Sequence, residues 1–231
     1  MQNLTKHNNI YLSGGGDEHQ SFPLDKFFFD NLPKKGKFLY IPIALRGNKL
    51  FPTASNWMDN VLKLHSRTDL VFTTAKTLEG YNINSLLDFD AIYIGGGNTW
   101  QLMSEINESG FNTLLIEYLG NNKKIYGGSA GAIILGKRIN THDDPNNIEY
   151  SVIDGVDIIS GYSVACHYSA EQYGRFKNWS IRTKMPIICL YEETGLVVSN
   201  NKIICKGTKP CTVIAKDGKS IDYQPDEEFS I

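Results

Sequence analysis

The segment YGGSAGA at residues 126–132 decides the fold, because it joins a short apolar run to a second apolar run of helical character. Its context is therefore strand, tight turn and helix. Small residues at Gly127 and Gly131 let the two backbones approach closely. In such a G-x-S-x-G turn the serine is strained and its hydroxyl projects above the sheet, while the Ala130 N–H points toward developing negative charge. Ser129 is the candidate nucleophile; the alternative is a glycine-rich turn in which it only caps a helix.

Short apolar runs alternate with helical stretches on both sides of this segment. The predicted strands are 9–12, 37–43, 70–72, 91–94, 124–126 and 185–190. The predicted helices are 23–31, 56–64, 100–107, 111–119, 129–135 and 170–183. Each strand is continuously apolar, which is typical of a parallel sheet buried on both faces. The pattern predicts an α/β fold with a mostly parallel sheet and helices on both faces.

The C-terminal part of the sequence has a different pattern. Short strands are expected at 195–199, 202–205 and 212–215, separated by turn formers at 199–201 and 216–218. We expect antiparallel strands there, and a loop at 140–147, which is rich in turn formers. A length of 231 residues fits a single domain over 1–231.

Composition narrows the function classes. A net charge of −2, from 23 basic and 25 acidic residues, gives no field that would draw the chain to nucleic acid. No apolar run is long enough to span a bilayer, and the first residues lack the apolar core of a signal peptide. The four cysteines show no C-x-x-C spacing. We therefore expect a cytoplasmic protein with no membrane or nucleic-acid partner, no metal and no cofactor; the sequence does not predict the oligomeric state.

A second glycine motif, GGGN at residues 95–98, ends a predicted strand just before a helix. Such a loop presents bare backbone N–H groups, so the Gly97 N–H is expected to form the other half of an oxyanion hole. The alternative is a phosphate-binding turn. It lacks the G-x-G-x-x-G pattern, because Trp100 stands at the third glycine, and it lacks a Walker lysine.

GGGNTWQL at 95–102, followed by GGSAGA at 127–132, resembles the peptidase E (aspartyl dipeptidase) family and its cyanophycinase relatives. The resemblance extends from Tyr11 to about Val198. It implies a class I glutamine-amidotransferase-like fold and a serine peptidase that cleaves small peptides by acyl transfer.

A serine nucleophile needs a base, and histidine has the pKa that suits this role. His167 closes an apolar strand just before a polar helical stretch, a position that can be structural or catalytic. In peptidase E relatives the catalytic histidine stands before an aromatic residue, which His167-Tyr168 matches, so the resemblance implies that it is the base. Cys166 is an alternative nucleophile, but neighbours in a strand point to opposite faces.

Two carboxylates compete for the third position of the triad. Asp144 lies fifteen residues after Ser129, a spacing similar to that of peptidase E itself. Glu192 resembles the glutamate of cyanophycinase-like members. We favour Glu192 because the end of a buried strand is a more rigid mount than a loop, and we expect Glu193 to face solvent.

Asn98 and Arg175 are the candidate substrate-binding residues. Peptidase E members recognise an N-terminal aspartate through an arginine that follows the catalytic histidine, so the resemblance implies a preference for N-terminal acidic residues. Arg175 is similar instead to an arginine of cyanophycinases, and a guanidinium binds carboxylates well. It also fits a solvated helix face, which leaves restriction to aspartyl dipeptides open.

Two other functions stay open. An esterase of the α/β-hydrolase type shares the turn around Ser129, but its histidine usually stands late in the chain and it does not explain the GGGN loop. A catalytically inactive binding or regulatory homologue would use Ser129 only as a cap. A Ser129 Oγ within about 3.2 Å of a His167 nitrogen would favour catalysis.

Overall fold

The computed structural model describes residues 10–199 and 202–230. Three expectations concern residues outside these ranges, wholly or in part. They are the first residue of the strand at 9–12, most of the turn at 199–201, and the lack of an apolar signal segment in the first residues.

The main sheet has eight strands in the order β12-β9-β8-β1-β5-β4-β2-β3. The strands of its parallel part are β1 (Ile10–Ser13), β2 (Lys37–Ile41), β3 (Val71–Thr74), β4 (Ala91–Ile94) and β5 (Lys124–Gly128). Its antiparallel part consists of β8 (Thr194–Ser199), β9 (Lys202–Gly207) and β12 (Glu228–Ser230). The predicted α/β class, with a mostly parallel central sheet and antiparallel C-terminal strands, is confirmed.

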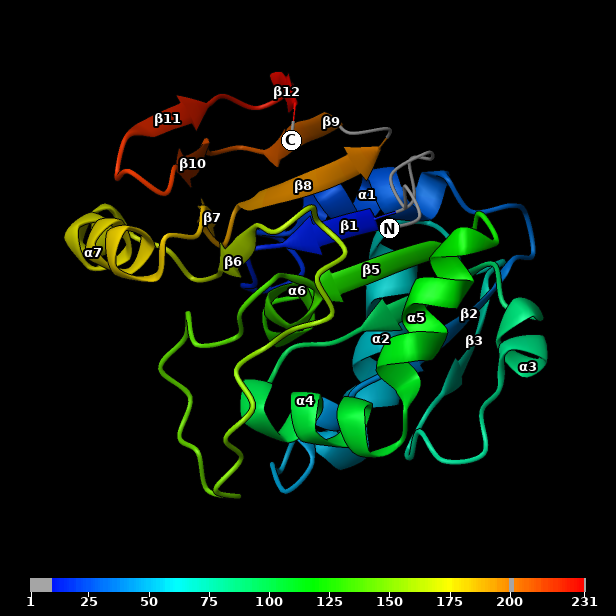
Figure 1. The fold of residues 1–231 in the computed structure, drawn as a ribbon. Coiled ribbons are helices and arrows are strands. Elements are labelled where there is room, and N and C mark those ends of the chain that lie inside the picture. The colour runs from blue at the N-terminus through cyan, green and yellow to red at the C-terminus, as the bar shows by residue number, and fades with distance from the viewer. Residues whose placement is uncertain (1–9, 200–201, 231) are drawn as a thin grey trace.

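Helices cover both faces of the main sheet, as Figure 1 shows for α5 in front and α2 behind. Alternate strand residues point to opposite faces: Leu12 belongs to the core that includes residues of α4, α5 and α6, whereas Tyr11 belongs to the core that includes residues of α1 and α2. The helices are α1 (Phe22–Asp30), α2 (Ala54–Leu64), α3 (Ile83–Leu87), α4 (Thr99–Glu108), α5 (Phe111–Gly120) and α6 (Ala130–Leu135). Two 3-10 turns, η1 (Ile43–Leu45) and η2 (Phe51–Thr53), precede α2.

A second sheet of four strands has the order β11-β10-β7-β6. Its strands are β6 (Ser163–Ala165), β7 (Ile187–Leu190), β10 (Cys211–Ile214) and β11 (Ser220–Tyr223). The expected helix at 170–183 is a 3-10 turn, η3 (Ala170–Gln172), followed by α7 (Tyr173–Thr183). The strand predicted at 185–190 thus belongs to the second sheet, where it runs parallel to β6 and antiparallel to β10. The apolar residues of this segment predicted a buried strand but did not predict which strands it pairs with.

No helix in the described ranges combines the length and the apolar character needed to cross a bilayer.

Candidate active site

The turn between β5 and α6 has the geometry of a nucleophile elbow. Ser129 adopts φ 51° and ψ −113°, a conformation that side chains rarely take outside strained functional turns. A Cβ on Gly127 would lie 2.6 Å from the carbonyl carbon of Gly131, and a Cβ on Gly131 would lie 2.3 Å from the Ile94 oxygen. The small residues are therefore required by close backbone contact, as the sequence indicates.

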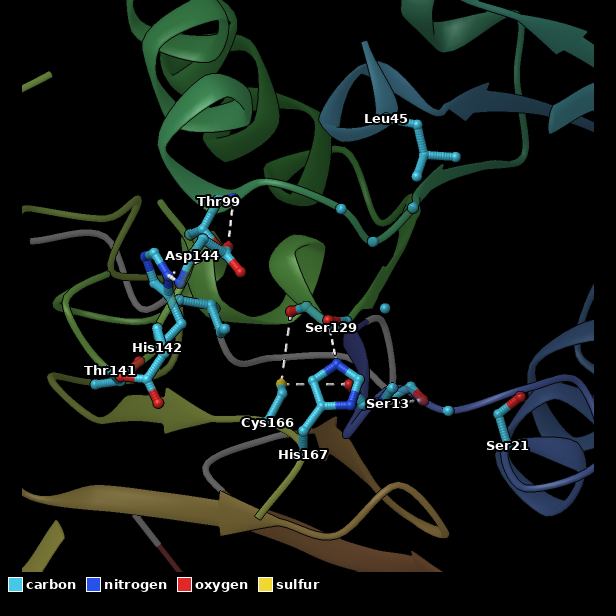
Figure 2. Close-up of a pocket in the computed structure, with 18 of the residues that line it drawn as sticks. Ser13, Ser21, Leu45, Thr99, Ser129, Thr141, His142, Asp144, Cys166 and His167 are labelled. Carbon is cyan, nitrogen blue, oxygen red and sulfur yellow. Dashed lines mark hydrogen bonds and ion pairs between the residues drawn. The ribbon is translucent and has the colours of Figure 1, made fainter. Parts of the chain in front are cut away.

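Ser129 Oγ lies 2.7 Å from Nε2 of His167, inside the limit set above (Figure 2). His167 follows β6 by two residues, and its backbone N–H donates to the Gly14 carbonyl at 2.9 Å. Half of the His167 side chain is exposed. The imidazole is thus fixed at its backbone yet open to an incoming molecule.

Glu192 lies on the other side of the imidazole, in the turn between β7 and β8. Its Oε1 is 2.8 Å from Nδ1 of His167, and its Oε2 accepts a hydrogen bond from Nε2 of Gln20 at 2.8 Å. The hydrogen bond to His167 lowers the pKa of Glu192, and Gln20 adds to this effect. Glu193 turns away and pairs with Lys209, with Oε1 and Nζ 3.0 Å apart.

Asp144 is bound at a different place, at the start of α4. Its Oδ2 accepts hydrogen bonds of 2.7 Å from both the backbone N–H and the hydroxyl of Thr99, and it lies 3.1 Å from Nδ1 of His142. Burial raises the pKa of Asp144, but the hydrogen bonds from His142 and Thr99 outweigh it and lower the pKa to about 2. In the described part of the chain it makes no hydrogen bond or ion pair with His167.

Three backbone N–H groups of the two glycine motifs have no hydrogen-bond partner among residues 10–199 and 202–230. They belong to Gly96, Gly97 and Ala130. Ala130 directly follows Ser129, and a Cβ on Gly96 would lie 3.0 Å from Cβ of Ser129. Gly97 has φ +138° and packs on Ala44, whose oxygen would lie 2.3 Å from an added Cβ. Free N–H groups beside a nucleophile can stabilise an oxyanion.

A pocket of about 680 Å³ opens over Ser129 and His167. Polar residues, among them Thr99, His142 and Asp144, lie on one side of Ser129 in Figure 2, and Leu45 and Ser21 lie on the other. This volume falls in the range of small-molecule sites. In the described residues no group of three or more His, Cys, Asp or Glu side chains could hold a metal ion.

A sequence model of peptidase family S51 matches residues 10–206, which span the elbow, His167 and Glu192. The chain belongs to peptidase family S51. Membership of this family supports a serine peptidase.

Curated peptidase E proteins are similar to part of the chain. Peptidase E of Shewanella sp. (strain W3-18-1) is 27% identical over 135 residues, which are 54% of this chain and 57% of the relative. Peptidase E of Shewanella baltica (strain OS195) is 24% identical over 155 residues, or 63% of this chain and 65% of the relative. The match therefore spans less than two thirds of the length of these curated relatives.

Solved structures show the same fold. A candidate peptidase E protein of Listeria monocytogenes EGD-e superposes with a TM-score of 0.68 at 21% identity, covering 88% of this chain and 98% of that one. A peptidase from an acI-B1 Actinobacterium gives a TM-score of 0.70 at 18% identity and covers 96% of both chains.

A further glycine loop, 14–16, packs against the site of this S51 protein and was not singled out from the sequence. Gly15 has φ +107°, and a Cβ there would lie 2.3 Å from Cε1 of His167. A Cβ on Gly16 would lie 2.9 Å from Cβ of Glu192. Three glycines directly after a buried strand were the available signal. The sequence did not predict a role for Gln20 either, because no motif around it indicates that it hydrogen-bonds Glu192.

The two expected substrate-binding residues have protein partners. Asn98 caps α4 by accepting the Gln101 N–H, and its Nδ2 donates to the Pro145 oxygen at 2.9 Å. Arg175 lines the pocket and forms a two-pronged ion pair with Asp143, one prong being 2.7 Å. Whether either residue binds substrate stays a prediction.

Cys166 fits poorly as a nucleophile. Its Sγ lies 3.5 Å from the Ser129 carbonyl oxygen and 3.6 Å from that of Ser13. Burial raises the pKa of this thiol, so the reactive thiolate is disfavoured. The contacts place Cys166 beneath the elbow as a packing residue.

Proposed function

We propose that this chain is a serine peptidase that hydrolyses small peptides by acyl transfer through Ser129, His167 and Glu192. The observation that carries the proposal is the 2.7 Å contact between Ser129 Oγ and His167 Nε2, at a strained elbow that opens into the pocket. An inactive homologue would have no need to align the imidazole with this hydroxyl.

In the first half of the reaction, Ser129 Oγ attacks the peptide carbonyl and His167 Nε2 takes its proton. The imidazolium is stabilised by Glu192, which also fixes the tautomer by accepting the Nδ1–H at 2.8 Å. The C–N bond then breaks, and His167 returns the proton to the leaving amine. In the second half, His167 takes a proton from the water that attacks the acyl-serine. The bond between the acyl carbon and Ser129 Oγ then breaks, and His167 returns the proton to Oγ, which releases the acid product and restores the site.

The oxyanion that forms in each half needs hydrogen-bond donors. The free N–H groups of Gly97 and Ala130 fill this role in the proposal, and Gly96 is a further donor beside Ser129. Because these groups are fixed by the backbone, they need no rearrangement as the charge develops.

We also propose that the peptidase prefers substrates with an acidic N-terminal residue. Arg175 is the cation in the pocket that would bind the substrate carboxylate. Its ion pair with Asp143 must then open, so a substrate carboxylate takes the place of the Asp143 side chain.

A fluorophosphonate probe tests the proposal, since it forms a covalent bond only with an activated serine. We expect labelling of the wild-type protein at Ser129, mapped by mass spectrometry, and none of Ser129→Ala, whose circular dichroism spectrum should be unchanged. Absence of labelling in the wild type, or equal labelling of the folded Ser129→Ala variant, would contradict it.

A further inference from the structure

The side of the pocket away from Arg175 has a chemistry that the proposed mechanism does not use. We call it the aromatic lobe and define it by Tyr40, Leu45, Leu50, Trp57, Tyr93 and Tyr126. Its residues come from β2, η1, α2, β4 and β5, or lie just before η2. Figure 2 shows Leu45 across Ser129 from Thr99, Asp144 and His142.

The aromatic side chains that line the lobe pack against one another. Tyr93 stacks on Tyr126 with ring centroids 4.2 Å apart, and Tyr40 meets Tyr93 edge to face at 5.7 Å. Trp57 contacts Tyr40 at 6.2 Å. The Tyr126 hydroxyl donates to the fully buried Asp25. The lobe is thus formed before any ligand arrives, which reduces the ordering cost of binding.

Charge separates the two sides of the pocket. All the charged or titratable residues that line it, apart from the tyrosines and Cys166, belong to the other side or to the triad: His142, Asp143, Asp144, His167 and Arg175. The aromatic lobe therefore suits an uncharged group. Tyr40 is 2% exposed, and burial raises the pKa of its hydroxyl, so this wall of the lobe stays neutral as well.

The aromatic lobe is continuous with the reacting centre. Tyr126 stands three residues before Ser129 in the same strand and turn, and the Tyr40 hydroxyl would lie 3.6 Å from a Cβ on Gly95. A side chain in the lobe therefore belongs to a residue next to the bond under attack. Leu50, at the edge of the lobe, is 52% exposed and leaves its mouth open.

We propose that the aromatic lobe binds an aromatic side chain of the peptide substrate, on one side of the scissile bond. The inference rests on the proposed function of Ser129 and narrows its substrate class. Aromatic rings suit such walls because edge-to-face and offset contacts add to the burial of apolar area. The peptide would then place its aromatic residue in the lobe and its other flanking residue toward Arg175.

Protection of Ser129 from fluorophosphonate labelling tests the inference without needing turnover. The competitors are Ala-Phe and Phe-Ala, which place the ring on either side of the bond, with Ala-Ala as the matched control. We expect at least one phenylalanyl peptide to halve the labelling rate at about 10- to 100-fold lower concentration than Ala-Ala. Equal protection by all three peptides would overturn the inference.

Two variants locate the effect. Leu45→Asp and Leu50→Asp put a carboxylate into the aromatic lobe, and Leu50 is exposed enough that its replacement leaves the core intact. Each should reduce the advantage of the phenylalanyl peptide by about 10-fold while protection by Ala-Ala stays within about 3-fold. Ile221→Asp, at an exposed apolar residue of β11 outside the pocket, is the control and should behave as wild type.

An advantage that survives both lobe variants would also overturn the inference, because the ring would then bind elsewhere. Failure of the proposed function looks different: wild-type Ser129 would not be labelled at all, with or without peptide.

Discussion

Ser129 and His167 donate their backbone N–H groups to successive carbonyls, those of Ser13 at 3.1 Å and Gly14 at 2.9 Å. The two side chains come from different sheets, since Ser129 follows β5 of the main sheet and His167 follows β6 of the second. The end of β1 therefore holds both at once and sets the 2.7 Å contact between Oγ and Nε2.

The acid of the triad can be identified by a matched pair of amide substitutions. Glu192→Gln keeps the side-chain volume but loses the charge that stabilises the His167 imidazolium, so the rate of fluorophosphonate labelling should fall at least about 100-fold. Asp144→Asn should change that rate less than about 5-fold, because Asp144 binds Thr99 and His142. The reverse ranking would assign the role to Asp144.

Gly15 should be required for the position of the imidazole. In Gly15→Ala the added Cβ meets Cε1 of His167 at 2.3 Å, so the ring must shift and labelling should slow by about 10- to 100-fold. Gly80→Ala is the control: its φ is also positive, at +83°, but nothing lies within 4 Å of an added Cβ. Both variants should lose about 1 kcal/mol of stability in urea unfolding. Equal labelling rates in the two would show that the contact with His167 is irrelevant.

Opening the Arg175 ion pair should favour acidic substrates. Asp143→Asn leaves the guanidinium free for a substrate carboxylate, so KM for aspartyl dipeptides should fall about 3- to 10-fold while KM for Ala-Ala is unchanged. Asp154→Asn removes the partner of Arg138, a partly exposed pair at 2.8 Å outside the pocket, and should change neither value. An unchanged KM for aspartyl peptides in Asp143→Asn would argue against Arg175 as the carboxylate-binding residue.

The buried pair Asp25 and His65 should give opposite pH dependences of stability. Burial raises the pKa of Asp25 to about 6, so the folded state holds more protons there than the unfolded state and stability falls as pH rises from about 4 to 6. Burial lowers the pKa of His65 to about 4, so stability rises as pH increases from about 4 to 6.5. Each group changes the free energy of unfolding by about 3 kcal/mol across its pH range.

Urea unfolding at pH 4.5, 5.5 and 6.5 measures these contributions as differences from wild type. The stability of Asp25→Asn relative to wild type should rise with pH, and that of His65→Leu relative to wild type should fall. If both differences are independent of pH, neither group changes its protonation on folding.

The local parts of the fold and site could be predicted from the sequence. Continuous apolar runs gave the buried strands, except that the run at 70–72 forms the edge strand β3, where Val71 is 57% exposed. The spacing of Gly127, Ser129 and Gly131 between a strand and a helix predicted the elbow. These features depend mainly on neighbours in the chain, because the backbone conformations open to a residue are set by its own side chain and those next to it.

Contacts between distant segments could not be predicted in the same way. Apolar character marked residues 187–190 as buried but did not show that they form β7 of a second sheet, whose end brings Glu192 to His167. The sequence also did not predict that Gln20 hydrogen-bonds Glu192. Nor did it predict that Tyr40, Trp57 and Tyr93, which come from separate elements, contact one another.

The sequence by itself determined the class of fold, the strained turn that exposes Ser129 and a short list of residues that could assist it. Only the tertiary structure decided which carboxylate touches the imidazole, because Glu192 and Asp144 are equally capable acids and differ only in where packing puts them. The pairing of β7 with β6 brings Glu192 Oε1 to 2.8 Å from His167, while α4 holds Asp144 through Thr99.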